Sequence, residues 1–291
     1  MIKYLLVFSV FLAVENLEAY LFSKPPHQNV LPTTLNFDHI LSFDEEFRSK
    51  IITYVQSFPA NDYDVYLVQD LGLFWLEAKQ EYIKDILKRD EKWEPHIEAQ
   101  IKKHAKPGSI VIDIGAHIGT QTIIMARAVG EQGKVIAFEP QLKFFRELFM
   151  NLELNKAPNV YYFWGAISDK QELFKLPNLR DSCEVVSFLD FTTGYSGFDA
   201  PAGTLDSLEL KNVSLIKIDV DGIEDIVLDG IKNTVLSNKP VIIIEIQGGY
   251  SIETAPPEIV EKILHTKSTL INLGYTLHRI SGIDYLCVPN E

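Results

Sequence analysis

Residues 109–140 constrain the fold of this 291-residue chain more than any other stretch. The stretch opens with the apolar run Ile110–Ile114, which is interrupted only by Asp113. A short run rich in Ile and Val is typical of a strand buried on both faces of a parallel sheet. An apolar helical pattern over Thr120–Val129 and a second apolar run, Lys134–Phe138, follow. Strand, helix and strand in this order predict a unit that binds a ligand at the carboxyl edge of its sheet.

Two glycines, Gly115 and Gly119, bracket the turn between the first strand and the helix. Glycine lets the backbone approach a ligand closely, and the helix that begins after the turn offers free N–H groups to an anionic group. Glu139 ends the second strand, where a carboxylate can accept both hydroxyls of a ribose. The predicted cofactor-binding residues of this stretch are Asp113, Gly115, Ala116, Gly119, Thr120 and Glu139.

The dinucleotide fingerprint, which has glycines at its first, third and sixth positions, is absent from this turn. Counting from the first glycine, those positions hold Gly115, His117 and Thr120. The turn instead reads D-x-G-x-x-x-G, with Asp113 two residues before the first glycine. A carboxylate there repels phosphate and can hold an ammonium group. A ligand with a ribose, an amine and a carboxylate, such as S-adenosylmethionine, therefore fits better than NAD.

Further motifs follow in order along the chain: VIDIGAHIGTQT, AFEP, TLDSL, LIKIDVDGIEDIVLDG and KPVIIIEIQ. In this set the chain resembles the FkbM-type S-adenosylmethionine-dependent methyltransferases, over roughly residues 96–289. The resemblance implies a Rossmann-like fold, S-adenosyl-L-methionine as the cofactor, and a saccharide or related metabolite as the acceptor. Two positions depart from the family's usual pattern: His117 stands where Asn is more frequent, and KIDVEG reads KIDVDG here.

Apolar runs alternate with helical patterns after residue 140, which predicts a parallel sheet. The predicted strands are 159–163, 214–220 and 240–246, and the predicted helices are 143–154, 223–236 and 258–274. A final strand pair, 275–280 and 284–288, turns at Ser281–Gly282. The predicted fold class is α/β, a doubly wound and mostly parallel sheet with an N-terminal helical cap. The resemblance implies seven strands that close with an antiparallel hairpin.

The N-terminus predicts a separate targeting segment over residues 1–20. Lys3 precedes the apolar run Tyr4–Val14, and Ala19 suits a cleavage site, as in a secretory signal. The run is short for a transmembrane helix. An exported methyltransferase would lack the cytosolic methyl donor, whereas a viral, organellar or membrane-tethered setting would ease that conflict. The alternative is a cytoplasmic protein whose first segment docks on the domain as an apolar strand or helix.

Residues 21–105 form a predicted linker and cap, and residues 106–291 the methyltransferase domain. The cap is expected to contain helices over Phe43–Phe58, Gln80–Lys88 and Pro95–His104, and a hairpin around Asp70–Gly72. Acidic and basic residues alternate over residues 77–106, which is typical of a solvated helical face.

The chain carries 40 acidic residues against 27 lysines and arginines, a net charge of −13. This balance argues against nucleic acid as a partner and against nonspecific binding to anionic membrane, because both need a basic surface. Membrane association is expected only through residues 1–20. Cys183 and Cys287 allow one disulfide, and both are expected as free thiols near the core. No C-x-x-C or H-E-x-x-H spacing predicts a metal site.

Two carboxylates end predicted strands beside the expected position of the reacting methyl group. Asp219 follows the fourth strand in LIKIDVDG, and Glu245 ends the fifth in IIIEI. Methyl transfer is an in-line displacement that mainly needs its partners aligned, but a hydroxyl is a weak nucleophile and benefits from a base. Asp219 is the first predicted base and Glu245 the second, and Asp221 is placed to raise the pKa of Asp219. His117 is a third candidate.

Several other residues near these strands are candidates for binding the cofactor or the substrate, or for capping a helix. Ser168 and Asp169 follow the third strand, where they would border the adenine. Asp221 and Glu224 precede an apolar helical run, so the alternative is that they cap that helix. Phe191–Gly203 contains glycines typical of a loop at a substrate rim. Asp219 and Asp221 can bind a divalent metal only with further oxygen ligands, and the sequence does not decide whether a metal is needed.

Together the motifs predict an S-adenosylmethionine-dependent O-methyltransferase whose acceptor is a small molecule or glycan. Two alternatives stay open. One is a methyltransferase-like protein that binds a partner without catalysis, against which the intact motif set counts. The other is a different nucleotide-dependent Rossmann enzyme, such as a dehydrogenase, against which the missing fingerprint counts. The sequence does not predict the oligomeric state.

Overall fold

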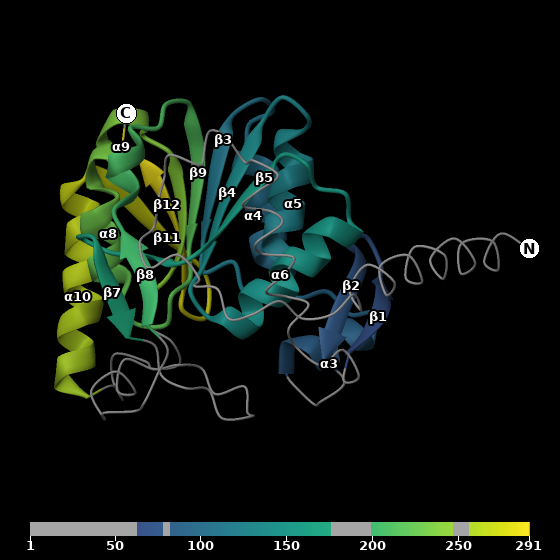
Figure 1. The fold of residues 1–291 in the computed structure, drawn as a ribbon. Coiled ribbons are helices and arrows are strands. Elements are labelled where there is room, and N and C mark those ends of the chain that lie inside the picture. The colour runs from purple at the N-terminus through teal and green to yellow at the C-terminus, as the bar shows by residue number, and fades with distance from the viewer. Residues whose placement is uncertain (1–62, 78–81, 176–198, 247–255, 291) are drawn as a thin grey trace, which may run out of the picture. The chain divides into compact units, whose positions relative to one another are not determined.

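Seven strands form the central sheet, in the spatial order β11-β12-β10-β9-β3-β4-β5 (Figure 1). Strands β3, β4, β5, β9 and β10 are parallel to one another, whereas β12 runs antiparallel to both β10 and β11. The predicted doubly wound sheet with an antiparallel C-terminal hairpin is therefore confirmed. The bounds are β3 Ile110–Ile114, β4 Lys134–Glu139, β5 Val160–Trp164, β9 Val213–Ile218, β10 Val241–Glu245, β11 Tyr275–Ser281 and β12 Asp284–Pro289.

The computed structural model describes residues 63–77, 82–175, 199–246 and 256–290, which belong to one compact unit. The predicted targeting segment, the predicted helix over 43–58 and Cys183 lie outside these ranges. Cys287 is buried with a free thiol. Within the described ranges, every helix is too short or too polar to cross a bilayer.

Helices cover both faces of the sheet (Figure 1). One face carries α4 Pro95–His104, α5 Thr120–Val129 and α6 Leu142–Leu154, and the other α8 Glu224–Gly230, α9 Lys232–Asn238 and α10 Pro257–Asn272. The central strands are buried between them, and all six residues of β9 are buried. This explains why the strands read as nearly continuous apolar runs in the sequence.

The helix predicted over 223–236 is two helices, which is a correction to that prediction. The chain leaves helical geometry at Ile231, where φ is −117° and ψ is 3°. A Cβ on the preceding Gly230 would lie 2.0 Å from the carbonyl oxygen of Ser168, so the chain passes another backbone closely at this point. Asp206, in the TLDSL motif, then caps α9 by accepting from the backbone N–H groups of Asn233 and Thr234.

The N-terminal part of the described chain is a β-hairpin and a helix: β1 Tyr63–Val68, β2 Gly72–Glu77 and α3 Tyr82–Lys88. The predicted hairpin is confirmed, and it packs against α6. Two asparagines of α6 hold it there. Asn151 Oδ1 accepts from the backbone N–H of Trp75 at 2.6 Å, and Asn155 bonds both backbone groups of Leu73.

A second, small sheet has the order β6-β8-β7, with β6 Ala166–Ile167, β7 Glu172–Lys175 and β8 Asp199–Gly203. Strand β8 corrects the prediction of a loop throughout Phe191–Gly203, because its last five residues pair with both neighbours. Residues 191–198 of that prediction lie outside the described chain.

Candidate active site

The carboxyl ends of β3 and β9 meet where the strand order reverses, and the predicted site residues gather at this edge. The backbone N–H of Asp219 donates to the carbonyl of Ile114 at 3.0 Å. Gly115 lies against this junction with a φ of +86°, and a Cβ there would be 1.8 Å from the carbonyl oxygen of Asp219. Only glycine fits at this position, because both the backbone angle and the space exclude a side chain.

The rest of the glycine turn is fixed by backbone hydrogen bonds. The N–H groups of Gly115 and Ala116 both donate to the carbonyl of Phe138 at 3.0 Å. Gly119 has a φ of +91° and packs against Leu148. Thr120 is the first residue of α5, as predicted. The turn therefore presents the N-terminal N–H groups of α5 at the same edge as Asp219.

Glu139 holds the turn from the neighbouring strand. Its Oε2 accepts from the backbone N–H of His117 at 2.9 Å, and its Oε1 accepts from that of Gln141 at 2.7 Å. Burial raises the pKa of Glu139 to about 8, although the two N–H donors act in the opposite direction. Each carboxylate oxygen has a second lone pair for a hydroxyl donor, so the role of Glu139 toward a ribose stays a prediction.

Asp113 faces a positive charge that the sequence analysis missed. Its carboxylate is fully buried, with Oδ2 accepting from the Thr122 hydroxyl at 2.6 Å and Oδ1 lying 3.7 Å from Lys217 Nζ. Lys217 Nζ also donates to Asp219 Oδ2 at 2.9 Å. The ammonium group beside Asp113 is therefore the chain's own. The available signal was a lysine at the centre of an apolar strand, since buried lysines are rare unless paired.

The pKa shifts of this pair follow from burial and charge. Burial raises the pKa of Asp113, and Lys217 opposes the rise. Burial alone would lower the pKa of Lys217, but the carboxylates of Asp219, Asp113 and Glu94 outweigh it, and the net shift is upward. Lys217 is therefore a permanent cation of the site.

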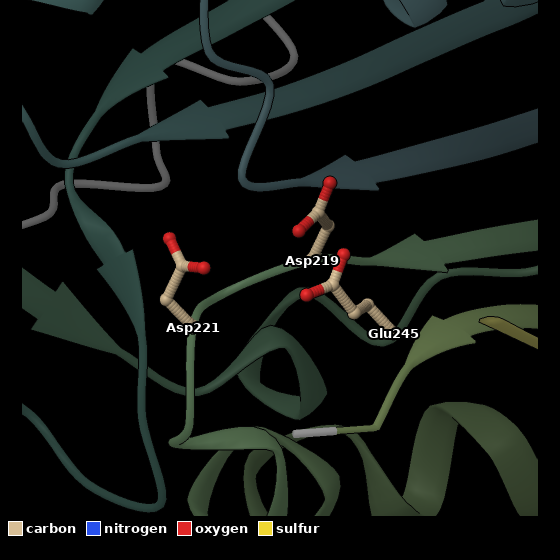
Figure 2. A group of neighbouring side chains, drawn as sticks. All are labelled: Asp219, Asp221 and Glu245. Carbon is tan, nitrogen blue, oxygen red and sulfur yellow. The ribbon is translucent and has the colours of Figure 1, made fainter. Parts of the chain in front are cut away.

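Figure 2 shows three carboxylates that converge at the ends of β9 and β10. One oxygen each from Asp219, Asp221 and Glu245 lies within 4.8 Å of the others. Burial, and then the charge of Asp219, raises the pKa of Asp221 and of Glu245. Such a group can accept a proton near neutral pH, or its oxygens can bind a cation. The structure thus brings together the first two predicted bases.

Asp221 does not cap the following helix, which corrects that alternative. Helix α8 begins at Glu224, and its N-cap position is Ile223, which makes no side-chain capping bond. Asp221 lies two residues earlier with a φ of +54°. Glu224 does bond locally, because its Oε1 accepts from the N–H of Gly222 at 2.9 Å. Burial raises the pKa of Glu224 to about 7.

His117 has an environment that argues against its role as a base. Its half-buried ring packs on Phe144, with the ring centroids 3.9 Å apart. Burial and the charges of Lys84, Lys217 and Lys143 lower the pKa of His117 to about 3. The ring is therefore neutral at pH 7 and binds a proton weakly.

Ser168 and Asp169 lie at the small sheet. The Ser168 side chain is buried, and its hydroxyl lies 2.9 Å from Glu172 Oε1 and 3.2 Å from Asp169 Oδ1. Asp169 is exposed at the turn that follows β6. Their contact with an adenine stays a prediction.

Helix α4 contributes polar groups that sequence reasoning assigned to a solvated face. Glu94 immediately precedes α4 and is half-buried, and its Oε2 accepts from Gln121 Nε2 at 3.3 Å. Burial, followed by the charge of Asp219, raises the pKa of Glu94 to about 7, and Lys217 opposes the rise. These partners come from α5 and β9, so the alternating charges of the segment gave no sign of them.

A second contact joins α4 to strand β12 of the sheet. His96 Nε2 lies 2.8 Å from Asp284 Oδ2, and Asp284 is paired in register with Glu245. Carboxylates therefore outnumber cationic groups at this edge of the described structure, and the excess negative charge favours a positively charged ligand. The carboxylates are Glu94, Asp113, Glu139, Asp219, Asp221, Glu224, Glu245 and Asp284.

Comparison with known families gives one match. Residues 113–277 match the sequence profile described as Methyltransferase FkbM domain. The matched segment begins at Asp113 and includes both glycines of the turn, Glu139 and the three carboxylates of Figure 2. A comparison with curated protein sequences finds no match.

Solved structures resemble the chain distantly. A methyltransferase FkbM from Methylobacillus flagellatus is 14% identical over 65% of this chain, with a TM-score of 0.42, and the match spans about half (49%) of that protein. A SAM-dependent methyltransferase from Aquifex aeolicus is 16% identical, with a TM-score of 0.40, over 72% of this chain and 100% of its own. Fibrillarin from Aeropyrum pernix, solved with S-adenosyl-L-methionine bound, is 14% identical, with a TM-score of 0.40. The match covers 78% of this chain and 93% of fibrillarin.

Proposed function

The chain belongs to the methyltransferase FkbM domain family, and from this premise we propose that it methylates a hydroxyl group of a saccharide or related metabolite. Membership makes it an S-adenosylmethionine-dependent methyltransferase, so its cofactor is S-adenosyl-L-methionine. The choice of oxygen as the acceptor atom is supported by the carboxylates of the site, and the saccharide by the family resemblance of the motifs.

The residues of the site fit this cofactor. S-adenosyl-L-methionine carries a sulfonium and an ammonium group against one carboxylate, and the site has an excess of carboxylates. Gln121 Oε1 is buried without a hydrogen-bond partner among the described residues, so it can accept from a bound donor. Glu139 would accept from the ribose hydroxyls, and the N-terminal N–H groups of α5 would bind the cofactor's carboxylate.

The observation that carries the proposal is the convergence of Asp219, Asp221 and Glu245. The cofactor supplies a methyl group that is already activated for displacement, so the protein must align the acceptor and remove its proton. A hydroxyl needs such a base more than an amine or a thiolate does. Carboxylates whose pKa is raised by burial are stronger bases than ordinary ones, which suits them to this task.

Glu245 is the base that the contacts favour. The Asp219 carboxylate already accepts a hydrogen bond from Lys217 Nζ at 2.9 Å, so one of its oxygens is engaged by the chain itself. Burial and the charges of Asp219 and Asp221 raise the pKa of Glu245. The hydroxyl proton would pass to Glu245 and then to water, while Asp219 holds Lys217 in place.

The test is a transfer assay with labelled S-adenosyl-L-methionine. Acceptors would be free sugars, nucleotide sugars and glycosides, each with a matched analogue in which an amine or a thiol replaces the hydroxyl. We expect labelled methyl ether on hydroxyl acceptors. Transfer only to amines or thiols would contradict O-methylation, and cofactor binding without transfer to any acceptor would favour the non-catalytic alternative.

A further inference from the structure

We propose that Glu94 and Gln121 form the subsite for the ammonium group of the cofactor's amino acid portion. Both lie outside the residues that the sequence analysis assigned to the cofactor, and Glu94 precedes the segment that matches the family profile. The inference rests on the cofactor of the proposed function and adds the residues that bind its ammonium group.

Asp113, the residue first predicted for this task, already faces a positive charge of the chain itself. Its side chain is completely buried, and its Oδ2 accepts from the Thr122 hydroxyl at 2.6 Å. Its Oδ1 has no hydrogen-bond partner among the described residues, but it lies 3.7 Å from the charge of Lys217 Nζ. A ligand ammonium beside Asp113 would be close to the positive charge of Lys217, and that repulsion is costly in a buried setting. Another acceptor is therefore needed for the ammonium group.

Gln121 has the acceptor atom that such a ligand requires. It is the second residue of α5, directly after the glycine turn, and its side chain is 4% exposed. Its Nε2 donates to Glu94 Oε2 at 3.3 Å, while its Oε1 is buried with no partner among the described residues. A buried amide oxygen without a donor costs free energy, and a bound donor would remove that cost.

Glu94 supplies the negative charge next to this amide. It stands at the N-cap position of α4 but makes no side-chain capping bond, and its φ is +44°. Its carboxylate is thus aimed at Gln121 instead of the helix. An ammonium group has three donors and no acceptor, which matches a carboxylate beside an unpartnered amide oxygen.

The charges around Glu94 favour the same ligand. Asp219 and Asp284 raise the pKa of Glu94 beyond the effect of burial, whereas Lys217 and His96 lower it. The net shift of the pKa of Glu94 is upward, and a ligand cation beside the carboxylate would favour its charged form.

Isothermal titration calorimetry with two ligands tests the proposal. One is S-adenosyl-L-homocysteine, and the other is its analogue in which hydrogen replaces the amino group. For wild-type protein the analogue should bind about 10- to 100-fold more weakly, the range for a charge-assisted hydrogen bond. Glu94→Gln should weaken S-adenosyl-L-homocysteine by a similar factor and leave the analogue within about twofold of wild type.

The matched control is Glu98→Gln, one helical turn further along α4. Glu98 already pairs with Lys102 at 2.5 Å and Lys92 at 3.6 Å, so both affinities should stay unchanged. Gln121→Leu is a second test, which replaces the amide by an apolar side chain of similar size. It should also weaken only the ligand that has the amino group.

The outcomes separate this inference from the function on which it rests. Equal weakening of both ligands by Glu94→Gln or Gln121→Leu, with unchanged thermal melting, would overturn the ammonium subsite. So would variants that bind both ligands as wild type does. Failure of wild-type protein to bind either ligand, or S-adenosyl-L-methionine itself, would instead overturn the proposed function and the subsite with it.

Discussion

The side-chain amide of Asn151 donates a hydrogen bond to the backbone carbonyl of Ile118 at 2.9 Å. Ile118 lies inside the glycine turn, and the other end of the same amide accepts from the backbone N–H of Trp75. One buried side chain of α6 therefore joins the β1–β2 hairpin to the turn that is predicted to face the cofactor.

Replacing this residue should loosen the turn as well as the hairpin. Asn151→Leu leaves the Ile118 carbonyl and the Trp75 N–H without their partner, at a cost of about 1–3 kcal/mol for each. We expect a lower melting temperature and a roughly 5- to 10-fold weaker S-adenosyl-L-homocysteine affinity, about 1 kcal/mol. Asn155→Leu is the control, because Asn155 bonds Leu73 of the hairpin and not the turn. Equal affinities of the two variants would contradict the link.

Lys217 should be needed for stability. Lys217→Met leaves the carboxylates of Asp113 and Asp219 without their ammonium partner, which costs about 3–5 kcal/mol for a broken buried ion pair. Urea unfolding at pH 8 should reveal that loss, and it should shrink at pH 5. The reason is that burial raises the pKa of Asp113, so this carboxyl takes up a proton more readily as the pH falls. Lys211→Met, at an exposed position after η2 (Leu205–Leu208), should have little effect at either pH.

The ligand-free protein should lose stability as the pH rises from about 4.5 to 8. Burial raises the pKa of Glu139 to about 8 and of Glu224 to about 7, so the folded state binds more protons than the unfolded chain between these limits. Their favourable contribution is complete below the unfolded pKa and disappears as the pH passes the folded one. Glu139→Gln should make the melting temperature depend less on pH. The corresponding change in the free energy of unfolding across this range is on the order of a few kcal/mol. The exposed substitution Glu131→Gln should leave the slope unchanged.

Cofactor binding near pH 7 should release protons. A cation beside Glu94 favours its charged form, so the pKa of about 7 would fall and the bound proton would leave. Titrations in buffers of different ionisation enthalpy measure this release directly. Glu94→Gln should reduce it, and at pH 9 the contribution of Glu94 should vanish because the group is already ionised. Proton uptake at pH 7 would contradict the charge balance of the site.

Glu245→Gln should reduce turnover more than cofactor affinity. Loss of a general base typically costs about 10²- to 10⁴-fold in rate. The wild-type kcat should rise with pH because a base whose pKa is raised must lose its proton to act, and the variant should lack this rise. Asp219→Asn should instead lower the melting temperature, since it weakens the partner of Lys217. A kcat of Glu245→Gln that equals wild type would exclude it as the base.

The sequence predicted the central sheet well because its strands are short apolar runs with glycine or proline at their ends. Helices α4 and α5 begin and end where predicted, since Pro95 and the glycines Gly119 and Gly130 mark their limits. Strand β8 was missed because its sequence, DAPAG, has turn residues, and pairing with β6 and β7 overrides that preference.

The residues of the candidate site likewise divide into those that the sequence predicts and those that it does not. Residues that end strands, such as Asp219 and Glu245, could be predicted, because parallel strands bring their carboxyl ends to one edge. The role of Glu94 could not be assigned, because its partner Gln121 comes from another element. Lys217 stood out as a lysine in an apolar strand, but its pairing with Asp113 on a neighbouring strand could not be predicted. Local charge pattern carries no information on such tertiary pairs.

The amide bridge of Asn151 also affects how this protein can be divided. The segment shared with the family begins at Asp113, yet the turn is held through Trp75, and Glu94 also comes before that point. A fragment cut at Asp113 would strip α6 of the strands that cover it and expose its apolar side to water. Transplanting the shared segment alone into another protein would therefore transfer the carboxylates of the site without the hairpin that supports the turn beside them.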